Sequence, residues 1–323
     1  MRLNEIFAGT VIMNRFFLRA ALCAVIGVPS AIDAQGCCGI GGSLVAGGIP
    51  TLENGNVFVQ AGAEHSSATY QSRYRTSIPL TLGYGVTNRL AVFVKTSYAW
   101  MHEAVFTQSI VVNNVVLLPD TTIVFDNNDI GDATVAAQFS IVPLNVIDKQ
   151  ELKAGMDVGI PWGPDQKRLN RALLSAAMQS GSGGLTLGGF VSYTKAVPAY
   201  KCAASATIGG RYKFKNRRGE KPGAEGSALV SMIAGPFWIT TATLSVGYKA
   251  TNFTYEANGV KVPSSAGSRL DILPGMEFAF TEQVKASCEA TVPLWRDEYQ
   301  KTYGKALGLR ASLFFLFPVF GDG

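Results

Sequence analysis

Two histidines, His65 and His102, are the side chains best suited to acid–base chemistry, because the chain contains no others. Ser66 and Ser67 follow the first histidine, and Glu103 follows the second. A serine nucleophile, a histidine base and an orienting carboxylate perform acyl transfer, which would suit a lipid-modifying enzyme. The chain has no Gly-x-Ser-x-Gly segment, the turn that exposes such a serine. We interpret these residues as polar groups near strand ends and predict neither catalytic residues nor enzymatic activity.

Other site chemistry is also poorly represented. The 5 cysteines form no Cys-x-x-Cys pair, and with 2 histidines the composition predicts no metal site. Glycine pairs at 183–184, 188–189 and 209–210 lack the Lys-Ser/Thr of a phosphate-binding loop, so no cofactor is expected. The net charge of +5 is small and scattered, so we expect no nucleic-acid partner.

The composition points to a lipid-facing protein. The chain is 47% hydrophobic and only 16% charged, against about 25% charged residues in a soluble domain. After the N-terminal region, no segment has the run of about 20 apolar residues that a transmembrane helix needs. Because only helices and closed barrels pair all backbone groups within a bilayer, the composition predicts a membrane β-barrel.

The N-terminal region has the pattern of a secretory signal. An apolar run at 20–28 follows two arginines and precedes small residues. We expect a signal peptide at 1–34, a Gly-rich periplasmic lead at 35–54 and an outer-membrane barrel at 55–323. Cys37 would then lie close to the new N-terminus. Lipidation of Cys37 is one interpretation, and a free or disulfide-bonded thiol in an oxidising compartment is the other.

Alternation of apolar and polar residues runs through the mature chain. Successive side chains of a strand point to opposite faces, and segments of about ten alternating residues are typical of membrane barrels. Twelve such segments begin near residues 55, 75, 90, 131, 151, 184, 202, 227, 238, 269, 284 and 306. The prediction is an all-β, transmembrane antiparallel up-and-down β-barrel of about 12 strands, with ten or fourteen also compatible with the pattern.

The lengths of the links between these segments also alternate. Short links fall at 87–89, 143–150, 198–201, 235–237 and 281–283. Longer links separate them, near 66–73, 101–129, 162–183, 215–226, 256–268 and 296–305. Outer-membrane barrels pair short periplasmic turns with longer extracellular loops, so the rhythm favours this class.

Charged residues fall on one face of these segments, which we expect to line the lumen because a charge on the lipid face is costly. The basic members are Arg75, Lys95, Lys153, Arg211, Lys213, Lys249, Lys285 and Arg310. The acidic members are Glu64, Asp157, Asp271, Glu277 and Glu289. Two interpretations stay open: ion pairs that crosslink a closed interior, and a wet channel that mildly favours anions.

Three short segments resemble one family. Asn128-Asp129-Ile130-Gly131-Asp132 before a strand at 133–141, and the turns at 85–90 and 280–284, are similar to segments in the outer-membrane proteins of the meta-pathway of phenol degradation. The resemblance implies passage of small hydrophobic or aromatic molecules.

The sequence thus predicts a porin-like channel or transporter for passive passage of small molecules across a Gram-negative outer membrane. Its expected partners are outer-membrane lipid, a small-molecule solute and the barrel-assembly machinery. One alternative is a non-transporting surface barrel that binds a partner through the links at 101–129 and 162–183. The other, less favoured, is a lipid-modifying barrel enzyme.

Overall fold

The computed structural model describes residues 52–68, 74–107, 110–112, 115–118, 121–142, 150–166, 168–169, 172–173, 180–217, 219, 223–237, 239–252, 255–257, 260–262, 267–297 and 305–318. The expected signal peptide, Cys37 and all but the end of the expected lead lie outside these residues. Among the described residues, no helix is long and apolar enough to cross a membrane.

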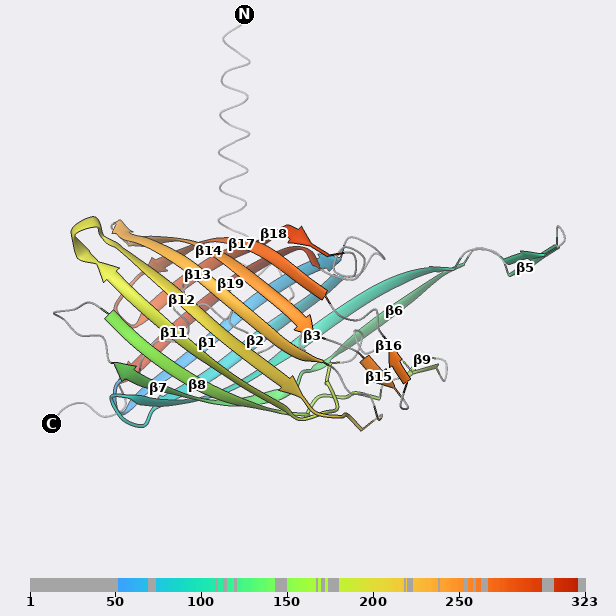
Figure 1. Ribbon diagram of the computed structural model, residues 1–323, viewed down its shortest axis with the longest axis horizontal. Coiled ribbons are helices and arrows are strands. Elements are labelled where there is room, and N and C mark those ends of the chain that lie inside the picture. Colours follow the sequence, from blue (N-terminus) through green and yellow to red (C-terminus); the bar gives the residue numbers. More distant parts are fainter. Residues whose placement is uncertain are drawn as a thin grey trace, which may run out of the picture.

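Twelve antiparallel strands close into a barrel (Figure 1). They are β1 (Asn56–Ala68), β2 (Tyr74–Gly85), β3 (Leu90–Thr107), β7 (Ala133–Val142), β8 (Gln150–Ile160), β11 (Thr186–Val197), β12 (Cys202–Lys213), β13 (Ala224–Phe237), β14 (Thr240–Asn252), β17 (Gly267–Ala279), β18 (Val284–Arg296) and β19 (Lys305–Pro318). Each strand pairs with its neighbours in chain order, and β1 pairs with β19 to close the wall. The prediction of an up-and-down barrel of about twelve strands is confirmed.

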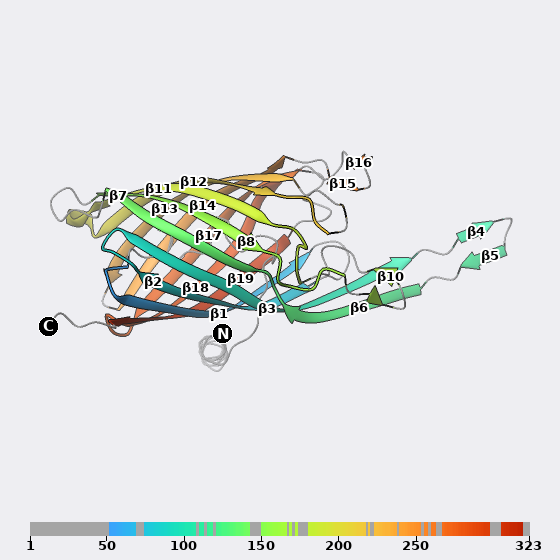
Figure 2. The ribbon, with the colours of Figure 1, turned by 90° about the horizontal axis from the view of Figure 1, so that it is seen from below.

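The expected loop at 101–129 is wrong, because much of it is strand. The first half of β3 pairs with β7, and its second half pairs with β6 (Thr121–Ile130) from Tyr98 to Thr107. This two-stranded arm projects beyond the barrel, with β4 (Ile110–Val112) and β5 (Val115–Leu118) farther out (Figure 2). Val, Ile and Thr are common in this segment, and these β-branched residues favour strands.

Smaller elements occupy other links. In the long links, β9 (Arg168–Leu169) pairs with β10 (Ala172–Leu173), and β15 (Tyr255–Ala257) pairs with β16 (Val260–Val262). The short 3-10 helix η3 (Pro198–Tyr200) bridges β11 and β12. These two long links therefore carry short hairpins.

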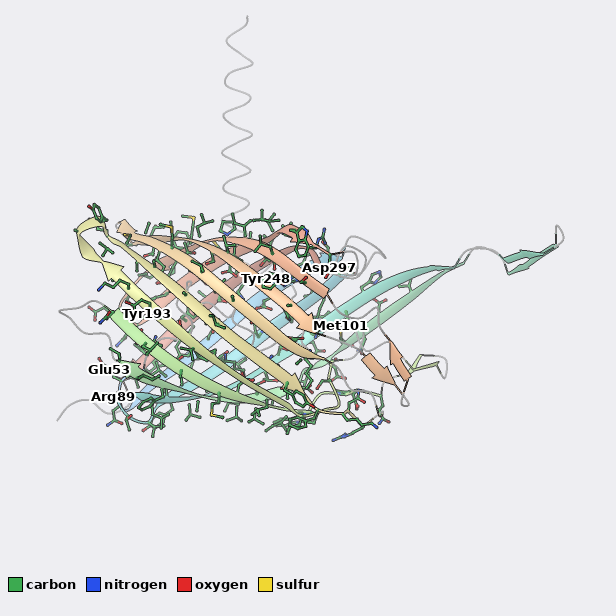
Figure 3. The ribbon with its side chains drawn as sticks, in the orientation of Figure 1. Glu53, Arg89, Met101, Tyr193, Tyr248 and Asp297 are labelled. Carbon is green, nitrogen blue, oxygen red and sulfur yellow. The ribbon has the colours of Figure 1, made fainter. Side chains whose placement is uncertain are left out.

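The short links share one end of the barrel, which we call the short-turn end. Glu53 and Arg89 lie there, whereas Met101 and Asp297 lie toward the opposite, long-link end (Figure 3). The threonine Oγ1 of Thr87 accepts hydrogen bonds from the backbone N–H groups of Arg89 and Leu90. In the same way, Thr281 Oγ1 accepts hydrogen bonds from the backbone N–H groups of Gln283 and Val284, where β18 begins. Side-chain hydroxyls that bond the backbone two or three residues on stabilise tight turns.

The two faces of the wall differ in the way that a bilayer requires. On β8, Met156, Val158 and Ile160 point outward and are 64%, 37% and 44% exposed, while Lys153 and Asp157 point inward and are buried. An apolar outer surface of this extent needs a non-aqueous neighbour, and membrane barrels place lipid there. Lys195 is a charged residue that shares the outward face, close to the short-turn end of β11, where a long side chain reaches the interface.

Candidate functional site

The barrel interior contains the charged residues that the sequence singled out. Each lies on the inward face of its strand, alternating with residues of the apolar outer face. The predicted set omitted inward charges at strand ends, among them Glu151, Glu225, Arg269 and Arg296 of β8, β13, β17 and β18. Strand alternation reaches them once each strand is extended to its observed end.

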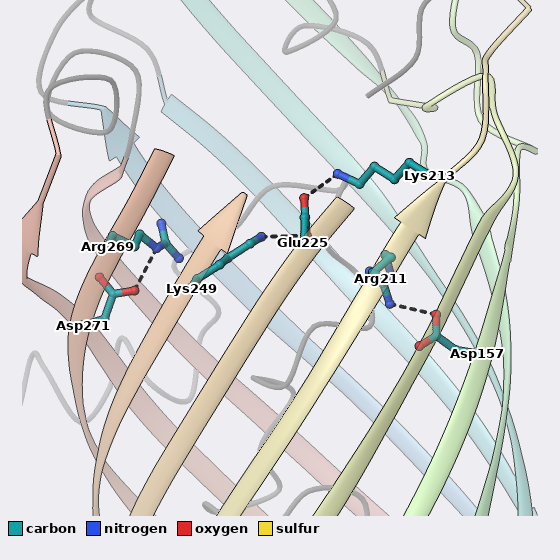
Figure 4. A network of polar contacts seen from close by, with 7 residues as sticks. All are labelled: Asp157, Arg211, Lys213, Glu225, Lys249, Arg269 and Asp271. Atoms are coloured by element: carbon teal, nitrogen blue, oxygen red, sulfur yellow. Dashed lines mark hydrogen bonds and ion pairs between the residues drawn. The ribbon is translucent and has the colours of Figure 1, made fainter. Parts of the chain in front are cut away.

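A belt of ion pairs crosses the inner wall toward the long-link end (Figure 4). The Glu225 carboxylate lies 2.5 Å from Lys213 Nζ and 3.0 Å from Lys249 Nζ, joining three neighbouring strands. On the adjacent strand, Arg269 pairs with Asp271 at 2.9 Å. The belt therefore runs from β12 to β17.

The belt continues through a pair that skips one strand. Arg211 Nη2 on β12 lies 2.8 Å from Asp157 Oδ2 on β8, with β11 between them. Gly188 of β11 stands in register with both residues, and a Cβ atom there would lie 2.4 Å from Asp157 Oδ1. Glycine at this position therefore makes room for the ion pair. Both charged side chains are less than a tenth exposed.

Further pairs crosslink the rest of the interior. Arg310 of β19 donates to the Glu64 carboxylate of β1 across the closing seam. Lys285 of β18 lies 3.2 Å from Glu277 of β17. Along β8, Lys153 lies 2.9 Å from Glu151. In low-dielectric surroundings such pairs offset the cost of burying each charge.

An apolar cluster fills the interior near the short-turn end. The rings of Phe58, Phe93 and Phe314, from β1, β3 and β19, are at most 3% exposed. Phe58 stacks on Phe314 with ring centroids 6.2 Å apart and meets Phe93 edge-on at 6.4 Å. Leu52, the first described residue, is 1% exposed and belongs to the same cluster. One side of the barrel is therefore packed like a core at this end.

Access to solvent differs strongly between opposite walls. On β2, β3, β7 and β8 almost all inward-facing residues are buried. On β14, β17 and β18 most inward-facing residues stay partly exposed. The side chains of Lys249 and Lys285 are 36% and 40% exposed, whereas their carboxylate partners Glu225 and Glu277 are 13% and 12% exposed. We call the inward face of β14, β17 and β18 the accessible wall. In both of these ion pairs the lysine is more exposed than the carboxylate.

The two histidines do not meet a serine. His65 lies on the outer face of β1, and its ring stacks on Tyr74, which stacks in turn on His102. His102 Nδ1 lies 2.7 Å from Asp126 Oδ1 on β6, whose side chain is mostly exposed. Ser66 points to the interior and is buried. In the described part of the chain, neither histidine forms a hydrogen bond with a serine side chain.

Comparison with known proteins identifies the fold. No family model and no curated protein matches the chain. An outer membrane channel from Pseudomonas putida F1 superposes with a TM-score of 0.62 at 16% identity, over 85% of this chain and 100% of that one. The NanC porin superposes with a TM-score of 0.46 at 10% identity, over 80% of this chain and 98% of that one. The KdgM porin, solved with disordered oligogalacturonate, superposes with a TM-score of 0.42 at 9% identity, over 81% of this chain and 99% of that one.

The fold and the apolar outer wall define a twelve-strand β-barrel of the bacterial outer membrane. Similarity at these identities extends to the fold alone. The resemblance to the phenol-degradation family therefore stays a prediction, and the solutes of the similar proteins belong to those proteins.

Proposed function

We propose that the protein is a passive outer-membrane channel for small molecules, inserted by the barrel-assembly machinery and without enzymatic activity. We further propose that its solutes are anions with a small apolar or aromatic body. The observation that carries the proposal is the accessible wall, where water reaches inward-facing side chains of β14, β17 and β18. A solute path along this wall would pass Lys249 and Lys285.

Charge supports a preference for anions. Lys249 and Lys285 expose about three times as much of their side chains as the carboxylates that they pair with. A passing ion therefore meets the ammonium groups first, and charged side chains of one sign set selectivity in a pore. A unit charge at 4 Å contributes about 1 kcal/mol in water, which is enough to bias passage without trapping the solute.

Apolar inward-facing residues support the second part of the proposal. Leu273 on β17 and Phe190 on β11 point inward and are partly exposed. Together with the lysines they would suit an amphipathic anion. The similarity of Gly131-Asp132 and of the short turns to the phenol-degradation proteins favours an aromatic body.

Liposome swelling and planar-bilayer recording with the purified full-length protein test the proposal. Benzoate should enter faster than the neutral benzyl alcohol, and chloride should carry more current than potassium. Lys285→Glu should lower the anion-to-cation permeability ratio severalfold, since the reversal changes the energy of an ion at 4 Å by about 2 kcal/mol before screening. Lys195→Glu, on the outer face, is the matched control and should leave the ratio unchanged. Absence of swelling and of conductance would refute the channel.

The β3–β6 arm favours one second candidate, a surface barrel that binds a partner. Beyond the barrel, β6 pairs with β3 alone in the described part of the chain, so each strand of the arm has an edge free for β-strand addition. Deleting residues 105–123 should abolish binding of surface ligands if this candidate is correct. Swelling that survives the deletion, with no binding lost, would favour the channel.

A further inference from the structure

The wall is interrupted where β6 gives way to β7, at Gly131 and Asp132, and two loop segments fold onto the interruption. Gly163 N donates to Asp132 Oδ1 at 3.0 Å. Ser182 donates to Asp132 Oδ2 twice, from its backbone N at 2.8 Å and from its Oγ at 2.6 Å. Asp132 thereby ties the segment 161–166 after β8 and the turn 180–184 before β11 to the wall.

The carboxylate of Asp165 lies beside this cluster, and its Oδ2 atom accepts no hydrogen bond. Asp165 is 5% exposed, and its Oδ2 is buried with no hydrogen-bond partner. That oxygen lies against Gly183, where a Cβ atom would stand 1.9 Å from it. Gly183 has φ of +67° and directly follows Ser182, so Asp165 points at the same turn that binds Asp132. In the described part of the chain, no Lys or Arg forms an ion pair with Asp132 or Asp165.

The surroundings of these carboxylates supply further oxygen atoms. The Ser97 and Ser180 hydroxyls are buried and have no hydrogen-bond partner. Both residues border Gly131, where a Cβ atom would lie 2.8 Å from Ser97 Oγ and 3.6 Å from the Ser180 carbonyl oxygen. Burial raises the pKa of the Asp132 carboxyl and Asp165 acts in the same direction, while the hydrogen bonds from Ser182 and Gly163 oppose them.

Two buried carboxylates with surplus oxygens and no basic partner in the described part of the chain are neutralised either by taking up protons or by binding a cation. We propose that the Asp132 and Asp165 carboxylates, with oxygen atoms of the turn 180–184, bind a calcium ion. A carboxylate offers about four lone-pair positions, so Asp132 keeps one beyond its three hydrogen bonds, and the Oδ2 atom of Asp165 keeps both of its own. Calcium accepts six to eight oxygen ligands in irregular geometry, whereas magnesium demands a near-ideal octahedron and retains water.

The ion would fasten both loop segments to the foot of the β3–β6 arm at the long-link end. This role is independent of conduction, because it needs only the loops and the wall. It goes beyond the sequence pattern, which predicts no metal site. The two carboxylates are far apart in the chain, and neither stands in a calcium-loop motif.

Thermal unfolding of the full-length protein in detergent, free of lipopolysaccharide, tests the site. Calcium should raise the unfolding temperature over EGTA, with half-saturation at about 0.1–1 mM as in extracellular calcium modules, and magnesium should have less effect. Asp165→Asn should remove the calcium response. In EGTA this variant should be at least as stable as the wild type, because it lacks an uncompensated buried charge.

Asp126→Asn is the matched control, because it removes an exposed carboxylate of the arm and should keep the full response. Should Asp165→Asn fail to fold, calcium titration calorimetry on the wild type and on Asp132→Asn decides. Saturable binding that weakens at least tenfold in Asp132→Asn supports the site. A wild type without a calcium response, or a response that survives Asp165→Asn, overturns it.

Discussion

The ion pair between Asp157 and Arg211 should contribute far more stability than the pair between Glu277 and Lys285. Its side chains are 7% and 8% exposed, whereas those of the second pair are 12% and 40% exposed. Asp157→Asn preserves volume but leaves the Arg211 guanidinium without its carboxylate. Removing one partner of a buried pair costs about 3–5 kcal/mol. Glu277→Gln leaves an ammonium that water reaches, so its expected cost is below about 1 kcal/mol.

Equilibrium unfolding in urea, with the barrel in lipid vesicles, measures both variants. The midpoint of Asp157→Asn should fall well below that of Glu277→Gln at an unchanged slope. Asp157→Asn combined with Arg211→Met removes both charges and should recover much of the loss, because the loss comes from burying a guanidinium that no longer has the Asp157 carboxylate beside it. Equal midpoints for the two single variants would refute the claim that the Asp157–Arg211 ion pair is a buried crosslink that stabilises the barrel.

Three further predictions concern residues of the barrel strands. Val191→Lys, on the outer face near the middle of β11, should destabilise the barrel in bilayers by about 2–4 kcal/mol, and Val191→Met should serve as its uncharged control beside the tolerated Lys195. Gly83→Ala should cost about 1–3 kcal/mol in urea unfolding, because its Cβ would stand 2.5 Å from the Phe93 ring. His102→Ala should change stability by less than about 1 kcal/mol and leave conductance intact, since its partner is an exposed carboxylate.

The sequence predicts the barrel well because lipid imposes a simple rule on it. Apolar side chains must alternate with polar ones along each spanning strand, and every expected strand start lies within three residues of the observed one. The same rule assigns the inward charges. It misses Glu225 because polar residues at a strand end look like a loop, and the strand begins three residues earlier than expected.

Contacts between distant strands are beyond reach of this rule. The pairing of Arg211 with Asp157 depends on a glycine in the intervening strand, and that alignment follows from registers that alternation leaves undefined. The alternation rule misses the β3–β6 arm for another reason. It extends past the lipid, so its residues are free of the alternation that marks a spanning strand. The Asp132 and Asp165 carboxylates likewise meet only through loop folding.

Barrels of twelve strands lie between small barrels filled by side chains and wide open porins. This barrel divides its interior accordingly, with a packed side behind β2, β3, β7 and β8 and an accessible wall opposite. The charges should therefore serve two separable purposes. Asp157→Asn should lower stability without changing ion selectivity, and Lys285→Glu should change selectivity with little loss of stability. If either variant alters stability and ion selectivity equally, the division of the interior into a packed side and an accessible wall is wrong.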